Sequence, residues 1–132
     1  MSYLLDTHTL IWSITEPNKL SPTAKKILIN AENDILVSVL SFWEISLKYS
    51  IGKLTLEDYL PEDFPKAAIA TGFKIVSLTA EITGTYHRLK ASYHRDPFDK
   101  MLIWQAIQQN LTFISCDENV HKYKSEGLKV IW

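Results

Sequence analysis

The chain has 132 residues, of which 46% are hydrophobic and 22% charged, the proportions of an ordinary globular domain. Its 14 basic and 15 acidic side chains give a net charge of −1, which argues against a protein that holds nucleic acid by its overall charge. The sequence lacks an apolar run of the roughly 18 residues that a membrane span needs, its start does not resemble a signal peptide, and its single cysteine excludes an internal disulfide. We therefore expect one cytoplasmic domain over residues 1–132 that does not enter a membrane.

Short β-rich runs alternate with longer helical patterns along the chain. The runs are continuously apolar rather than alternating, which is typical of strands covered on both faces. Strands that alternate with helices predict a parallel α/β sandwich with right-handed crossovers. The predicted strands are residues 3–5, 35–38, 74–77, 112–115 and 129–131.

The predicted helices carry start and stop signals. Ser21 stands before a proline and predicts an N-cap, and Asp96 likewise opens the most apolar helix, over residues 98–110. Gly72 falls where the helix after Pro61 should end. Thr79 can cap a helix whose inner face would be Ile82, Tyr86 and Leu89.

Four acidic residues fall near one edge of the predicted sheet. Catalytic groups of parallel α/β proteins gather outside the carboxyl ends of the strands. Asp6 ends the first strand and Asp117 follows the fourth. Asp99 lies in the first turn of the helix that leads into the fourth strand, and Glu44 lies one to two turns into the helix after the second. We expect these four carboxylates to converge.

Each acid also has an ordinary structural interpretation. Asp6 and Asp117 could be helix N-caps, Asp99 could interact with a helix dipole, and Glu44 could pair with Lys48 four residues later. Taken singly, these interpretations are favoured. Taken together, the structural interpretations are less convincing. Glu44 lies in the apolar stretch 41–47, where a charge needs a reason, and several carboxylates at one edge repel one another unless a cation is bound. Such a cluster suits Mg²⁺ or Mn²⁺ and the hydrolysis of phosphodiester bonds.

At these residues the sequence resembles the PIN-domain family, and most closely its VapC-type bacterial toxins. The resemblance covers essentially the whole chain, and four segments in register make it specific. The matching segments are LLDTH at residues 4–8, SFWEI at 41–45, HRDPFDK at 94–100 and ISCDE at 114–118.

The resemblance implies a three-layer α/β/α sandwich with a short five-stranded parallel sheet. It implies an endoribonuclease that cleaves RNA with Mg²⁺ or Mn²⁺, usually as a homodimer, and that a cognate antitoxin holds inactive. By resemblance Ser115 matches a small hydroxyl position near the site, and Asp96 belongs to the pattern although its proline neighbour suits a cap better. The residues that match the metal-binding and catalytic acids are Asp6, Glu44, Asp99 and Asp117.

Basic residues flank two of the acids and could form a rim that holds RNA phosphates. Solvated surface side chains are an equally good interpretation of them. The rim candidates are Lys48, Lys53, His94, Arg95 and Lys100. We expect no zinc site, because the histidines show no short zinc spacing, and we expect Trp12, Trp43, Trp104 and Trp132 to fill core or dimer contacts.

Other functions fit the sequence less well. A phosphate-binding G-x-x-x-x-G-K-[ST] loop is absent, which argues against ATP or GTP hydrolysis. A catalytically silent PIN-like module that binds RNA or protein is the main alternative, although such a module has no need for mutually repelling carboxylates. A metal-dependent DNA nuclease differs less from the expected ribonuclease, and the sequence leaves that alternative open.

Overall fold

Five short strands form one parallel sheet in the computed structural model, which describes residues 1–132. The strand order is β3-β2-β1-β4-β5, so the first strand lies at the centre, where Leu4 pairs with Leu36 on one side and Phe113 on the other. All four pairings are parallel, and the five strands coincide with the predicted runs to within one residue at each end. The strands are β1 (Ser2–Leu5), β2 (Asp34–Ser38), β3 (Lys74–Val76), β4 (Thr112–Ile114) and β5 (Lys129–Ile131).

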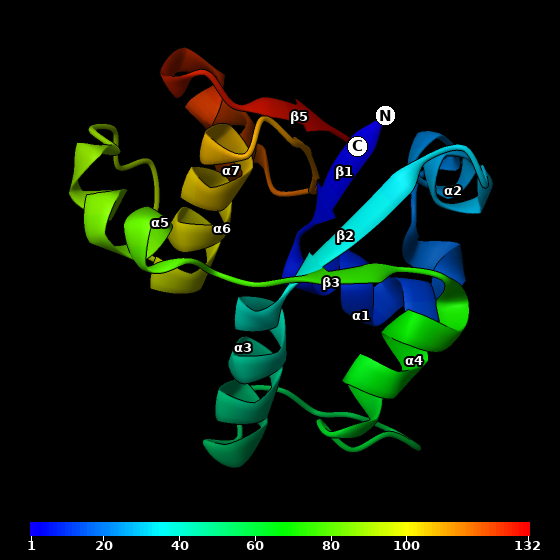
Figure 1. Cartoon of the computed structure of the whole chain (residues 1–132). Helices are drawn as coiled ribbons and strands as arrows, with labels where there is room; N and C mark the ends of the chain where they lie inside the picture. The colour runs from blue at the N-terminus through cyan, green and yellow to red at the C-terminus, as the bar shows by residue number, and fades with distance from the viewer.

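Helices cover both faces of the sheet and make three layers (Figure 1). On one face Leu5 packs with side chains of α1, α2, α3 and α4, and on the other Leu4 packs with α6, α7 and η3. Successive residues of a strand point to opposite faces, which is why neighbours such as Leu4 and Leu5 belong to different core clusters. The predicted three-layer α/β/α sandwich is confirmed. The helices are α1 (Thr7–Thr15), η1 (Pro17–Lys19), α2 (Pro22–Ile29), α3 (Val39–Ser50), α4 (Asp63–Thr71), α5 (Ala80–Thr85), η2 (Tyr86–Arg88), α6 (Pro97–Gln108), α7 (Glu118–His121) and η3 (Lys122–Glu126).

The predicted N-caps, and the predicted end of α4 at Gly72, are confirmed in atomic detail. Ser21 Oγ accepts a hydrogen bond from the Ala24 backbone N–H, and Thr79 Oγ1 accepts one from Ile82. Asp96 accepts from two backbone N–H groups in the first turn of α6. Gly72 ends α4 with a φ of 97°, a left-handed conformation in which glycine avoids the strain that a Cβ would cause.

Two expectations about burial are wrong. The edge strands β3 and β5 have no fully buried residue, because each pairs on one side only and helices cover less of the edges. The helix after Thr79 ends at Thr85, so Ile82 is buried while Tyr86 lies in a separate 3₁₀ turn. Of the tryptophans expected in core or dimer contacts, Trp104 is buried and donates its indole N–H to the Ile82 carbonyl at 3.0 Å. Trp43 is 60% exposed on α3, so for this residue a dimer contact stays a prediction.

None of the helices is both long enough and apolar enough to cross a bilayer.

Candidate active site

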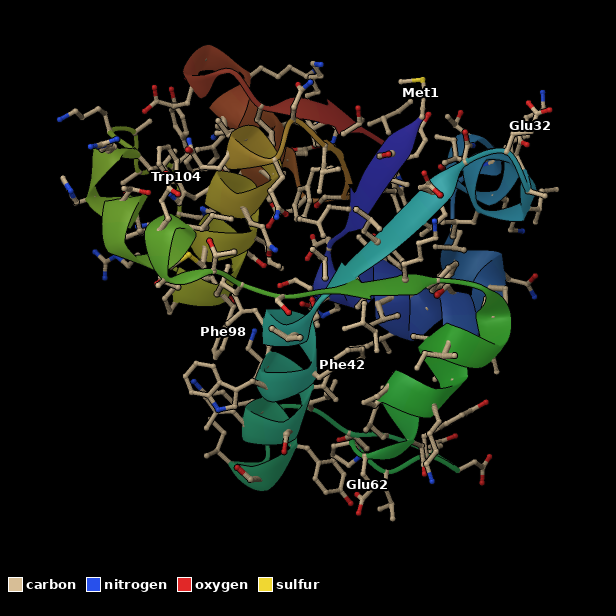
Figure 2. All side chains as sticks on the ribbon, viewed as in Figure 1. Met1, Glu32, Phe42, Glu62, Phe98 and Trp104 are labelled. Carbon is tan, nitrogen blue, oxygen red and sulfur yellow. The ribbon has the colours of Figure 1, made fainter.

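The acidic residues gather where the carboxyl ends of β1 and β4 meet the first turns of α6. A cavity of about 550 Å³ opens there, and a second cavity of about 340 Å³ adjoins it on the side of α3. Phe98, near the start of α6, lies close to α3 (Figure 2). Its ring packs edge-on against that of Trp43 on α3, with ring centroids 5.1 Å apart. The first cavity is lined by Asp6, His8, Trp12, His94, Asp96, Asp99, Cys116, Asp117 and Asn119.

Asp6 occupies the N-cap position of α1, but its side chain makes no capping hydrogen bond. Its Oδ2 instead accepts a hydrogen bond of 2.6 Å from Ser115 Oγ, and its Oδ1 is buried without a partner. The capping interpretation of this aspartate is therefore wrong. Burial raises the pKa of Asp6, the Ser115 hydroxyl opposes that shift, and the charge of Glu44 adds to it. The carboxylate lies in the cavity with an oxygen that the protein leaves unpaired.

Glu44 is 1% exposed, which is rare for a glutamate without a specific role. Its Oε1 accepts a hydrogen bond of 2.6 Å from Thr7 Oγ1, and its Oε2 accepts one from Lys48 Nζ. The pairing with Lys48 that the helical spacing suggested is therefore present. Thr7 is a site residue that the sequence reasoning missed. The only feature of the sequence that pointed to Thr7 was its position directly after Asp6, at the carboxyl end of the central strand.

Lys48 lies inside the acidic cluster rather than on a rim around it. Its Nζ is also 3.0 Å from Asp96 Oδ2, and the side chain is 25% exposed. Burial lowers the pKa of Lys48, but the hydrogen bonds and charges of the two acids outweigh it and leave the pKa raised. The same lysine, together with the backbone N–H groups of α6, holds the pKa of Asp96 below its usual value although burial opposes this.

Asp99 is a second carboxyl group whose ionisation its surroundings oppose. Its side chain is 15% exposed and faces Asp6, Asp96 and Glu44. Burial first, and then the negative charges of these three acids, raise the pKa of Asp99 to about 8, while Lys48 opposes the shift only in part. A carboxylate at this position is costly unless a cation lies beside it.

His94 is largely buried, contrary to its predicted place among exposed RNA-binding residues. Its side chain is 10% exposed, and its Nδ1 lies 3.2 Å from the hydroxyl of the buried Tyr123. Its Nε2 is 3.4 Å from Asp99 Oδ2 and has no hydrogen-bond partner. Burial lowers the pKa of His94 in spite of the neighbouring Asp117 and Asp96. The sequence indicated that His94 lies near the acids, but not that its side chain is buried.

Asp117 caps α7, as the structural interpretation expected, because its Oδ1 accepts a hydrogen bond of 2.8 Å from the Asn119 backbone N–H. Its side chain also lines the cavity opposite His94 and Asp99. Ser115 connects the two aspartates, since its Oγ donates to Asp6 and accepts from the Asp117 backbone N–H at 3.2 Å. Capping and a place in the cavity are thus compatible in one residue.

The remaining predicted rim residues lie around this cluster. Arg95 and Lys53 are exposed, and Lys53 lines the cavity beside α3. Lys100 is half-buried and donates a hydrogen bond of 2.7 Å to Ser92 Oγ.

The cluster offers two sets of ligand atoms that share Asp99. Each set brings one ligand atom from three residues to within 4.8 Å of one another: His94, Asp99 and Asp117 in one, Glu44, Asp96 and Asp99 in the other. Carboxylate oxygens suit hard divalent cations. The unpaired Oδ1 of Asp6, the repulsion at Asp99 and this donor set all fit a bound divalent ion.

The chain is similar to known proteins both in sequence and in fold. Ribonuclease VapC22 of Mycobacterium tuberculosis is 22% identical over 129 residues, covering 98% of this chain and 97% of that protein. The fold matches VapBC2 of Rickettsia felis bound to a promoter DNA fragment, with a TM-score of 0.67, 19% identity and coverage of 99% and 98% of the two chains. It also matches VapBC-1 of nontypeable Haemophilus influenzae, with a TM-score of 0.67, 15% identity and coverage of 99% and 97%.

The model of the PIN domain matches residues 3–126, which include every acid of the cluster. The chain belongs to the PIN-domain family.

Proposed function

We propose that this protein is a metal-dependent endoribonuclease and the toxin of a type II toxin–antitoxin system. The observation that carries the proposal is the convergence of Asp6, Glu44, Asp99 and Asp117, from four separate segments, on a site where Asp99 resists ionisation near neutral pH. A protein with no use for a cation would gain stability by replacing such repelling groups.

Asp6, Glu44, Asp99 and Asp117 would hold Mg²⁺ or Mn²⁺ in this proposal. Such an ion polarises a phosphoryl oxygen and lowers the pKa of a bound water, which is the chemistry that phosphodiester hydrolysis needs. The chain's own groups position the acids.

Ser115 orients Asp6 by its hydrogen bond and opposes the rise in the pKa of Asp6 that burial causes, and Thr7 orients Glu44 by its hydrogen bond. Lys48 places a positive charge beside the carboxylates, while exposed Lys53 and Arg95 would contact RNA phosphates at the edge of the site.

The relatives' names support the biological part of the proposal. The similar structures include VapBC and FitAB complexes and a toxin–antitoxin complex from Klebsiella pneumoniae. We infer that this chain has a cognate antitoxin, acts on RNA in the cytoplasm and forms a homodimer. The exposed apolar side chains of α3 and the turn after it, Trp43, Tyr49 and Ile51, offer a surface for such contacts.

The test is incubation of purified protein with cellular RNA and, separately, with single-stranded DNA, in Mn²⁺, in Mg²⁺ and in EDTA. We expect RNA cleavage that requires the cation and is lost in Asp6→Asn. The control variant is Asp34→Asn, at an exposed aspartate far from the cavity, which should cleave like the wild type.

Two outcomes would overturn the proposal. Cleavage of DNA but not RNA would identify a DNA nuclease. If equal expression of wild type and Asp6→Asn arrested growth equally, the protein would be a silent binding module whose effect does not depend on hydrolysis.

A further inference from the structure

One nitrogen atom faces the acidic cluster and has no role in the proposed four-carboxylate site. His94 Nε2 is buried without a hydrogen-bond partner, and the side chain that carries it is 10% exposed. Buried polar atoms are almost always paired, so an unpaired one indicates a missing partner. This atom faces Asp99, whose Oδ2 is its nearest acidic neighbour at 3.4 Å.

The distance of 3.4 Å suits two ligands of one ion better than a hydrogen bond. A hydrogen bond between nitrogen and oxygen spans about 2.7–3.2 Å. Two atoms that each lie about 2.1 Å from one ion are about 3–4 Å apart, depending on the angle at the ion. Asp117 supplies a third ligand atom within 4.8 Å of the other two. A small movement of these side chains would let all three atoms bind one ion.

Tyr123 holds the imidazole in the orientation that a ligand needs. The tyrosine is fully buried, its ring centroid lies 5.5 Å from that of His94, and its hydroxyl lies 3.2 Å from Nδ1. The backbone N–H of Tyr93 fixes that hydroxyl by a hydrogen bond of 3.0 Å. Histidine ligands commonly bond a second group through their other ring nitrogen, which orients the ring and leaves the first nitrogen's lone pair free for the metal.

We propose that His94 Nε2 is a metal ligand together with Asp99 and Asp117, and that it makes this site prefer a first-row transition ion such as Mn²⁺ or Co²⁺ over Mg²⁺. Mg²⁺ binds oxygen almost exclusively, whereas imidazole nitrogen adds affinity for transition ions. The inference rests on the proposed function in assuming that the acids bind a divalent cation. It adds which ion they select and which residue makes the selection.

The experiment reads the ligand directly and needs no RNA. Pulsed electron paramagnetic resonance of the Mn²⁺-loaded wild type should show the coupling of a bound ¹⁴N nucleus. His94→Gln should lose that coupling, and His87→Gln, at an exposed histidine of η2, should keep it. Calorimetry should show that the ratio of the Mg²⁺ to the Mn²⁺ dissociation constant falls about 10-fold or more in His94→Gln and is unchanged in His87→Gln.

Wild type in which Mn²⁺ binds without nitrogen coupling would overturn the inference, and so would coupling that persists in His94→Gln. If His94→Gln fails to fold, a wild-type spectrum without nitrogen coupling still overturns the inference. Tyr123→Phe then replaces that variant, and it should weaken Mn²⁺ binding several-fold more than Mg²⁺ binding. Nitrogen-bound Mn²⁺ without RNA cleavage would overturn the proposed function and leave this inference standing.

Discussion

Lys48 Nζ lies 3.0 Å from Asp96 Oδ2 and links the last turn of α3 to the N-cap of α6. Because the same ammonium also bonds Glu44, it neutralises part of a cluster that would otherwise hold only negative charge. The lysine and a bound cation therefore offer the carboxylates alternative sources of positive charge.

Replacing this lysine by methionine keeps most of the side-chain volume and removes the charge. In EDTA, Lys48→Met should lower the free energy of unfolding by about 1–2 kcal/mol, less than a fully buried pair would lose because the lysine is partly exposed. Its affinity for Mn²⁺ should rise, since no ammonium competes. Chemical denaturation and calorimetry measure both effects. Lys74→Met removes an exposed pair with Asp34 and should change the free energy of unfolding much less, so equal losses in the two variants would contradict the prediction.

Asp99 should make the metal-free protein less stable as the pH rises. Its pKa is about 8 in the folded protein against 3.8 for the unperturbed group, so the unfolded chain loses this proton first. The free energy of unfolding should therefore fall from about pH 4 to about pH 8 and level off above that. Asp99→Asn lacks this titration and should be more stable than the wild type at pH 8 by roughly 2 kcal/mol or more. Urea denaturation in EDTA at several pH values tests this, and parallel curves for both proteins would contradict it.

Glu44 separates a catalytic role from a structural one. Glu44→Gln keeps an acceptor for Thr7 but loses the charge, so we expect RNA cleavage to fall about 100-fold or more while the free energy of unfolding changes by about 1 kcal/mol or less. Cleavage rate and melting temperature are compared with those of Glu32→Gln, at an exposed glutamate. A stability loss with full activity would show that Glu44 only pairs with Lys48.

Ser115 affects the pKa of Asp6, the acid at the end of the central strand. Its hydroxyl is the hydrogen-bond donor that lowers the pKa of Asp6 against the effect of burial. Ser115→Ala should raise that pKa further, weaken Mn²⁺ binding about 10-fold and move the acidic limb of the cleavage rate to higher pH. Calorimetry and a pH–rate profile measure this, with Ser50→Ala, at an exposed serine, as the control. An unchanged profile would mean that Asp6 does not need this donor.

The sequence by itself determined the elements and the edge at which the acids meet. Apolar runs such as Tyr3–Leu5 and caps such as Ser21 and Thr79 act through neighbours within a few residues, so their effects can be read locally. The convergence of Asp6 and Asp117 followed from the parallel topology alone, since parallel strands end at one edge.

Only the tertiary structure decided how the site's side chains are paired. Thr7 with Glu44, and His94 with Tyr123, are contacts between segments 29 or more residues apart, and no local pattern records them. The same holds for the burial of His94 and the exposure of Trp43, which depend on what other elements leave covered. The raised pKa of Asp99 depends on three acids and a lysine that folding gathers around it, because electrostatic energy depends on distance and burial rather than on order along the chain.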